Sequence, residues 1–273
     1  MRLQDRPRFR ASAAVKFAGA RGFENAVEAV RQISQAGLHP SNCRLLDAVE
    51  AANSSAGDGT QCVLLVAFES ADHALDAWMA RTLEIAVGAG GVAPEGGAKT
   101  QSGGEGARDG AAGAWRNAFV NTPYLRDVLA RAGVVSETFE TAVTWDRFAE
   151  FHAGVGDAVR DAVQRVCGGG TLSCRSTHGY SDGPAPYYTI LAPGKRGAEH
   201  ERWDEIKPAG SAAGRRLVSP SLGTASLPSP LQGQVEPDEQ SVVGAHARQQ
   251  DGEFVAAQPG HGVAPPQALH QPT

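Results

Sequence analysis

The sequence predicts an α+β fold in which an antiparallel sheet carries its helices on one face and is followed by a disordered C-terminal tail. Short β-prone runs alternate with amphipathic helical stretches along the first three quarters of the chain. Strong turn residues, Asp182-Gly183-Pro184, separate two β-prone runs and indicate a hairpin. With 273 residues and 41% hydrophobic content, the chain can bury one large core or two modest ones.

The first unit, residues 11–91, is predicted to run strand, helix, strand, strand, helix. Gly37 stands where a helix C-terminal glycine is expected, and Pro40 follows shortly after it. An order of this kind suits an antiparallel sheet with helices on one face. The predicted strands and helices are, in order, 13–17, 22–36, 43–46, 62–68 and 72–87.

Residues 88–113 are rich in glycine, alanine and serine, and we expect them to form a flexible loop. They carry too little apolar surface to offset the entropy of ordering. Glycine clusters cradle phosphates when they join a strand to a helix N-terminus, but no GxGxxG or GKS/T pattern accompanies these glycines. The segment therefore predicts no phosphate site.

A second α+β unit follows the loop. Its first helix, 114–132, is expected to break at Pro123 because proline lacks the backbone N–H that a helix interior needs. A long amphipathic helix and the hairpin come next. The remaining predicted elements are a strand at 138–143, a helix at 145–166, strands at 172–180 and 187–191, and a helix starting at 199.

Residues 208–273 change in character and predict a disordered tail. Nine of the 16 prolines lie beyond Lys207, and Phe254 is the only aromatic residue there. Such a composition supplies no core. Translation in the wrong frame of a GC-rich gene and a genuine evolved tail both explain it, and the DNA sequence distinguishes them.

Composition excludes several classes of function. The net charge of -5 gives no reason to expect nucleic acid or an anionic membrane as a partner. The 4 cysteines follow no CxxC spacing, so we predict no metal site. No signal peptide and no apolar run long enough for a membrane span is present, which predicts a cytoplasmic protein.

Four segments in order resemble a known family: Ser41–Asp47, Tyr124–Asp127, Glu137–Arg147 and Cys174–Gly183. Together they are similar to the C-terminal, substrate-side domain of FAD-linked oxidases of the vanillyl-alcohol-oxidase type. Within that group they look most like the alkyldihydroxyacetonephosphate synthases and their bacterial relatives. The resemblance covers residues 1–207 and implies a ferredoxin-like antiparallel sheet with helices on one face.

The resemblance implies two catalytic candidates on one predicted strand. Tyr180 stands where the synthase motif has its catalytic tyrosine, and His178 alternates with it, so both side chains are expected on one face. A phenol has an ordinary pKa of about 10, so a basic tyrosine needs positive charge or hydrogen bonds nearby. The structural alternative is a hairpin tyrosine that only packs its ring.

Three arginines are candidates for binding a small anionic substrate, a phosphate or a carboxylate. Arg126 is the first choice because a guanidinium binds such groups through a bidentate fork. Arg44 lies on an otherwise apolar predicted strand and must meet an anion if it is buried. Arg175 is the third. Surface ion pairs, for example of Arg126 with Asp127, are the structural alternative.

FAD is the cofactor that the resemblance implies, although the family binds it mainly in an N-terminal domain that these residues do not resemble. The family's histidine cluster is also without a counterpart. We therefore expect a truncated flavoenzyme, the substrate-binding half, which binds flavin weakly or not at all by itself and pairs with a separate flavin domain. The alternatives are a non-catalytic ligand-binding or interaction module and an inactive remnant, so whether the chain is an enzyme stays open.

Overall fold

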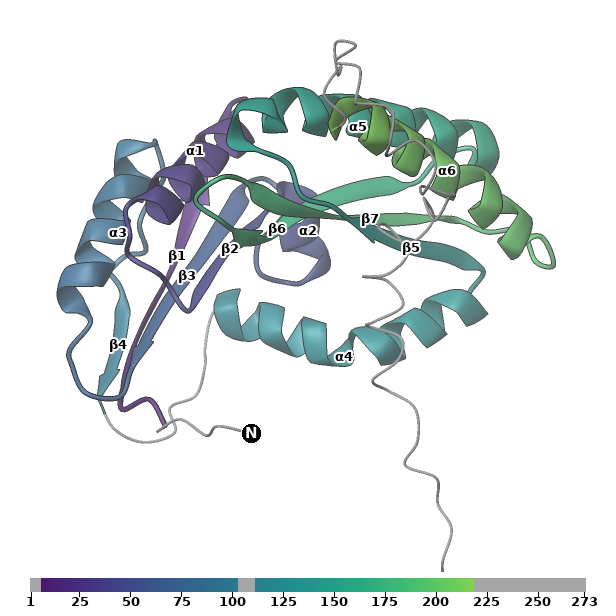
Figure 1. Cartoon of the computed structure of the whole chain (residues 1–273). Helices are drawn as coiled ribbons and strands as arrows, with labels where there is room; N and C mark the ends of the chain where they lie inside the picture. The colour runs from purple at the N-terminus through teal and green to yellow at the C-terminus, as the bar shows by residue number, and fades with distance from the viewer. Residues whose placement is uncertain (1–5, 103–110, 219–273) are drawn as a thin grey trace, which may run out of the picture. The chain divides into compact units, whose positions relative to one another are not determined.

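The computed structural model describes residues 6–102 and 111–218, which form a 7-stranded antiparallel sheet with helices packed on it (Figure 1). The strand order is β4-β1-β3-β2-β6-β7-β5. The elements are β1 (Phe9–Phe17), α1 (Gly22–Gln35), β2 (Asn42–Leu46), α2 (Ala48–Asn53), β3 (Cys62–Ser70), α3 (Asp76–Gly88), β4 (Lys99–Ser102), α4 (Ala111–Arg131), β5 (Val134–Glu140), α5 (Trp145–Cys167), β6 (Thr171–Gly179), β7 (Pro184–Pro193) and α6 (Glu199–Val218). The predicted α+β class and antiparallel sheet are confirmed.

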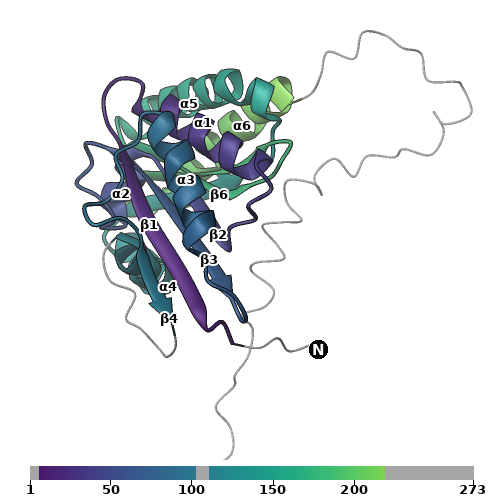
Figure 2. The ribbon, with the colours of Figure 1, turned by 90° about the vertical axis from the view of Figure 1, so that its left-hand side faces the viewer.

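The first half of the sheet builds its core beneath α1 and α3 (Figure 2). Alternate residues of β1 and β3 point to these helices, and Phe17, Leu64 and Phe68 are almost completely buried there. Residue Gly22 begins α1 close to the end of β1, where an added Cβ would lie 2.8 Å from the Phe17 carbonyl oxygen. The tight crossing from strand to helix therefore requires a residue without a side chain.

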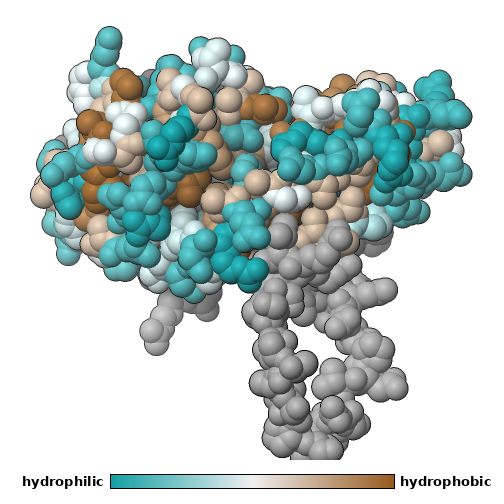
Figure 3. Space-filling model, turned by 90° about the horizontal axis from the view of Figure 1, so that it is seen from above, coloured by the Kyte–Doolittle hydropathy of each residue, from teal (hydrophilic) through white to brown (hydrophobic). Residues whose placement is uncertain are grey.

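The second half packs α5 and α6 on the same face of β5, β6 and β7. Phe151 and Tyr188 are buried at the centre of this cluster, and the Phe139 ring stacks on Tyr188 with centroids 4.9 Å apart. Seen from above, the outer surface of the layer of α1, α3, α5 and α6 is mostly hydrophilic, with apolar side chains in scattered spots (Figure 3). These helices therefore bury their apolar sides against the sheet.

The predicted hairpin of β6 and β7 is confirmed. The Tyr180 N–H donates to the Gly183 carbonyl, and β6 carries a register shift between Ser176 and His178, a β-bulge. A Cβ on Gly183 would lie 1.9 Å from the Val143 carbonyl oxygen, so the turn packs directly on the chain before α5. This contact fixes the orientation of the hairpin relative to α5.

The prediction that the helices share one face is wrong for α2 and α4. Figure 1 shows both on the opposite side of the sheet from α1, α3, α5 and α6. Helix α2, absent from the prediction, packs Ala51 on Leu46 and Val63 in a smaller core to which Trp115 of α4 adds its ring. Apolar residues on both faces of β2 and β3 thus let helices cover both sides.

Residues 88–113 do not form one flexible loop. Helix α3 ends at Gly88, β4 pairs with β1, and α4 begins at Ala111, while residues 103–110 lie outside the described part. Strand β4 is Lys-Thr-Gln-Ser at the edge of the sheet, so its backbone hydrogen bonds with β1, and not apolar burial, order it. Composition alone missed this pairing.

Two proline-based boundaries are also corrected. Helix α4 runs through Pro123 without a break; the proline is exposed, where water can satisfy the carbonyl that loses its partner. Helix α6 continues past Lys207 and Pro208 to Val218, because Gly210 and Ala213 pack against the second core. Lys207 therefore does not end the folded part, and residues 219–273 lie outside the described residues.

Helix α6 is held to the sheet by polar contacts as well. The Lys207 ammonium pairs with the Glu137 carboxylate on β5, and the Trp203 indole N–H donates to the same carboxylate. None of the described helices is long and apolar enough to cross a bilayer.

Candidate functional site

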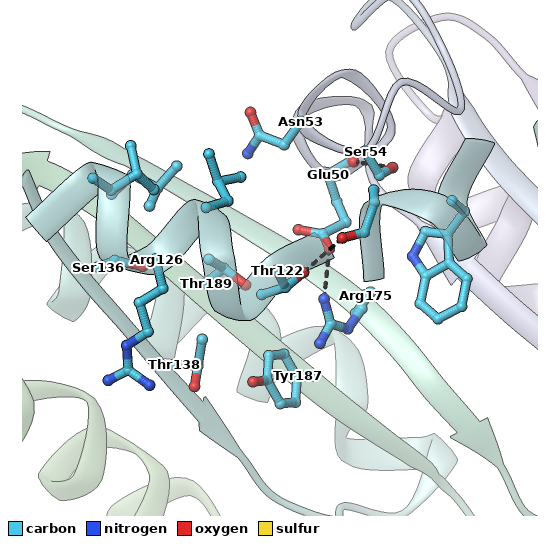
Figure 4. Close-up of a pocket in the computed structure, with 15 residues that line it drawn as sticks. Glu50, Asn53, Ser54, Thr122, Arg126, Ser136, Thr138, Arg175, Tyr187 and Thr189 are labelled. Carbon is cyan, nitrogen blue, oxygen red and sulfur yellow. Dashed lines mark hydrogen bonds and ion pairs between the residues drawn. The ribbon is translucent and has the colours of Figure 1, made fainter. Parts of the chain in front are cut away.

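The sheet face beneath α4 contains a pocket of about 190 Å³, called here the α4 pocket (Figure 4). Its roof is α4 with Trp115, Leu125 and Leu129, and its floor is the hydroxyl-bearing face of β5 and β7. Arg126 lies at one part of this pocket and Arg175 with Glu50 at another. The pocket thus combines an apolar roof, a row of hydroxyl groups and two cations.

Arg175 on β6 is held by two different contacts. Its Nη1 donates to Glu50 Oε1 at 2.7 Å, and its guanidinium carbon lies 3.9 Å from the centroid of the Tyr187 ring. Tyr187 is directly opposite Arg175 across the β6–β7 ladder, so the stack follows from the register. Glu50 is itself held by a 2.6 Å hydrogen bond from Ser173, which leaves this carboxylate fully engaged.

Arg44 on β2 has no carboxylate within hydrogen-bonding distance among the described residues, so the anion expected from its burial is not a described protein carboxylate. Instead its guanidinium stacks on Trp115 of α4, 3.6 Å from the ring centroid. Burial, and then repulsion from Arg175, lower the pKa of Arg44 to about 10, against the attraction of Glu50. Arg44 and Arg175 are therefore close enough to repel each other.

His178 and Tyr180 lie at the end of β6 in a second pocket, called here the hairpin pocket, of about 310 Å³. Their ring centroids are 6.2 Å apart, and Arg44 and Thr177 line the same pocket. Tyr180 is 55% exposed. The fold therefore brings Tyr180, His178 and Arg44 together, whereas Arg126 is exposed on α4 and lines the other pocket.

Four residues of the two pockets and of the contacts of Arg44 and Arg175 were not identified as site residues from the sequence: Glu50, Trp115, Thr177 and Tyr187. Trp115 lies far from Arg44 along the chain, and only the packing of α4 on the sheet brings them together. Tyr187 could have been found, because the hairpin register places it opposite Arg175. The β-bulge at Ser176/His178 leaves Thr177 as the extra residue of β6.

Two further buried polar contacts lie outside the pockets, one between α5 and β7 and one at the end of β2. His152 Nδ1 is 3.0 Å from the Tyr188 hydroxyl, and Cys174 N donates to Asp47 Oδ2 at 2.6 Å. Burial lowers the pKa of His152 to about 4 and raises the pKa of Asp47 to about 6. Burial also raises the pKa of the Cys174 thiol, so this cysteine is not a nucleophile.

Ser70, Asp72 and His73 meet at the end of β3 but do not form a catalytic triad. The same ring nitrogen, His73 Nδ1, lies 2.8 Å from Ser70 Oγ and 2.7 Å from Asp72 Oδ1. A triad needs one nitrogen for the serine and the other for the carboxylate. Among the described residues no group of His, Cys, Asp and Glu is placed to hold a metal ion.

The comparisons with known proteins agree with this fold. A family model, "FAD linked oxidases, C-terminal domain", matches residues 6–218. The chain therefore belongs to the FAD-linked oxidase C-terminal domain family. The match extends past Lys207 to the end of α6, as the fold does.

Solved structures of alkyldihydroxyacetonephosphate synthase share the fold. One, in space group P212121, is 17% identical with a TM-score of 0.61, covering 77% of this chain and 40% of that chain. Another, in P1, is 17% identical with a TM-score of 0.54, covering 76% and 41%. A complex of 4-ethylphenol oxidase from Gulosibacter chungangensis with isoeugenol is 11% identical, with a TM-score of 0.49 and coverage of 80% and 44%.

The chain thus spans about 40% of the length of the synthase chains. At this identity the likeness concerns the fold. A search of curated proteins gave no match.

Proposed function

We propose that this chain is the substrate-binding half of a FAD-dependent enzyme that acts on a small anionic substrate. Family membership supports the use of FAD. The observation that carries the proposal is the hairpin pocket, which combines a phenol, an imidazole and a guanidinium, Tyr180, His178 and Arg44. These groups supply a proton carrier and a cation in one cavity, as proton transfer from a bound anionic substrate requires.

The groups present fit a flavin's surroundings on the substrate side. Arg44 Nε and Thr177 Oγ1 are buried without a hydrogen-bond partner among the described residues, so donors remain for a bound group with electron-rich oxygens. FAD, when bound, would supply one of two chemistries. It would accept electrons from a hydroxyl-bearing substrate, or, as in alkyldihydroxyacetonephosphate synthases, it would support the exchange of one substituent of the substrate for another without net redox change. Both chemistries are within this proposal.

The chain's own residues have separate roles in the proposed reaction. Arg44 attracts the anionic group, while Tyr180 and His178 hold and move a proton at the reacting carbon. Arg126 lines the α4 pocket and not the hairpin pocket, so it is a separate candidate for contacting an anionic part of the substrate. A separate polypeptide or segment provides the flavin-binding domain, and the free thiols of Cys43, Cys62, Cys167 and Cys174 support a reducing, cytoplasmic setting.

Co-expression with the flavin-binding domain of a FAD-linked oxidase tests the proposal. A complex that absorbs near ~450 nm is expected. In that complex Tyr180→Phe should keep the flavin absorbance and lower turnover by roughly 10²- to 10⁴-fold, the scale for loss of a general acid or base.

Tyr124→Phe is the matched control, because Tyr124 on α4 is 72% exposed. Normal turnover in Tyr180→Phe removes the tyrosine from the mechanism. Failure to form a flavin-loaded complex with any such domain favours the non-catalytic ligand-binding module instead.

A further inference from the structure

Two guanidinium groups share one sheet face next to each other. Leu46 of β2 pairs with Arg175 of β6, so Arg44, two residues from Leu46, points to the same face and is a diagonal neighbour of Arg175. Thr177 is the extra residue of the β-bulge that follows Arg175 and Ser176, and it lines the hairpin pocket together with Arg44. Arg44 is therefore the neighbour of both other side chains: it repels Arg175 electrostatically and shares the hairpin pocket with Thr177.

Each of these side chains has a polar atom that the described protein leaves unused. Arg44 Nε, Arg175 Nε and Thr177 Oγ1 are buried and have no hydrogen-bond partner among the described residues. The large majority of buried side-chain polar atoms in proteins have a hydrogen-bond partner, and each specific exception requires an explanation. Three such atoms within one cluster point to a bound group that accepts hydrogen bonds.

The charges of the cluster lead to the same conclusion. Among the described residues, Glu50 is the carboxylate that pairs with Arg175 and attracts Arg44, and it already receives hydrogen bonds from Arg175 and Ser173. One positive charge is therefore left over in a partly buried place, where uncompensated charge is costly. An oxyanion would balance it, and the Nε edge of a guanidinium is one side of the fork that binds phosphate or carboxylate.

Aromatic rings hold both guanidinium groups in position. Arg44 lies on Trp115 and Arg175 on Tyr187, at 3.6 and 3.9 Å from the ring centroids. A ring covers the flat side of a guanidinium and leaves its edge donors available. Trp115 and Tyr187 therefore orient the arginines without using the N–H groups that an anion needs.

We propose that Arg44, Arg175 and Thr177 form a binding site for one oxyanion, a phosphate or a carboxylate group. The proposal rests on the proposed function in one respect, that this oxyanion belongs to the substrate. It moves the principal anion contact from Arg126 on α4 to the paired arginines on the sheet, and it assigns Trp115 and Tyr187 as positioning residues.

Calorimetric titration of the full chain, without flavin, tests the site with inorganic phosphate and with acetate. We expect binding with a dissociation constant on the order of 1 mM for one of the two, and the better ligand identifies the oxyanion. Arg44→Lys should weaken it about 10-fold or more, because an ammonium lacks the fork. Arg165→Lys, a change on the far face of the sheet, is the matched control and should not alter binding.

A second measurement separates ligand binding from packing. Thr177→Val removes a hydroxyl that has no hydrogen-bond partner in the described part of the chain, so the ligand-free variant should unfold at the same temperature as the parent or higher. Its thermal shift on adding the oxyanion should be smaller than that of the parent. Thr171→Val, the same change at the exposed first residue of β6, should leave the shift unaltered.

Several results overturn the proposal. They are binding of neither oxyanion, equal affinity in Arg44→Lys, an unchanged ligand shift in Thr177→Val, or loss of binding in Arg126→Lys with Arg44→Lys unaffected. These outcomes are independent of the flavin complex. Oxyanion binding without any flavin-loaded complex keeps the site and removes the proposed enzyme, and turnover without oxyanion binding does the reverse.

Discussion

Two buried titratable groups, His152 and Asp47, should give this protein a nearly flat stability between neutral and mildly acid pH. In the folded chain burial lowers the pKa of His152 from 6.5 to about 4. Burial raises the pKa of Asp47 from 3.8 to about 6. The two pKa shifts change the free energy of unfolding in opposite directions as pH falls. Removing either group should therefore reveal the pH dependence that the other group causes.

The directions follow from which state binds the proton first. As pH falls from 6.5 towards 4, His152 binds a proton in the unfolded chain but not yet in the folded chain. His152 therefore lowers the free energy of unfolding over this range. As pH falls from 6 towards 3.8, Asp47 binds a proton in the folded chain but not yet in the unfolded chain. Asp47 therefore raises the free energy of unfolding over this range. From about pH 7 to about pH 4.5 each amounts to about 2 kcal/mol, with opposite sign.

The perturbation is Asp47→Asn, which keeps an oxygen for capping α2, where Asp47 accepts from the Glu50 N–H. Its free energy of unfolding should fall by about 2 kcal/mol between about pH 7 and about pH 4.5. His152→Gln keeps a polar partner for the Tyr188 hydroxyl and should instead gain about 2 kcal/mol over that range.

Urea unfolding of the parent and both variants across this range measures the differences. The parent should change little. Equal pH profiles in all three proteins would refute the argument, because they would show that neither buried group titrates differently in the two states.

Further predictions concern the packing of the fold. Gly183→Ala should destabilise the protein by about 3 kcal/mol or more in thermal unfolding, because the new Cβ would meet the Val143 carbonyl oxygen at 1.9 Å. Gly88→Ala, with open space at the end of α3, is its control and should be neutral or stabilising; an equal loss in both would contradict the contact. Phe151→Ala, at 1% exposure, should cost about 3 to 5 kcal/mol in urea unfolding. Tyr124→Ala, at 72% exposure, should stay within about 0.5 kcal/mol, and a larger loss there would mean that α4 is more deeply packed than described.

The sequence alone determined the class of fold, the family and the hairpin. Apolar periodicity identifies β3 and α5, since burial on one side of an element leaves a repeat that a single sequence displays. Asp182-Gly183 identifies the turn, because turn geometry is a local property. The motif at Cys174–Gly183 indicated the family whose model matches the chain.

Only the tertiary structure decided which face α2 and α4 occupy and what surrounds Arg44. Helix amphipathicity shows that a side is buried but does not select one of two available sheet faces. The ring beneath Arg44 comes from Trp115, and the two residues meet through long-range packing that leaves no local signal. Long-range packing also decided where the folded part ends. Gly210 and Ala213 extend α6 through contacts with β5 and α5, and amino-acid composition alone does not reveal such contacts.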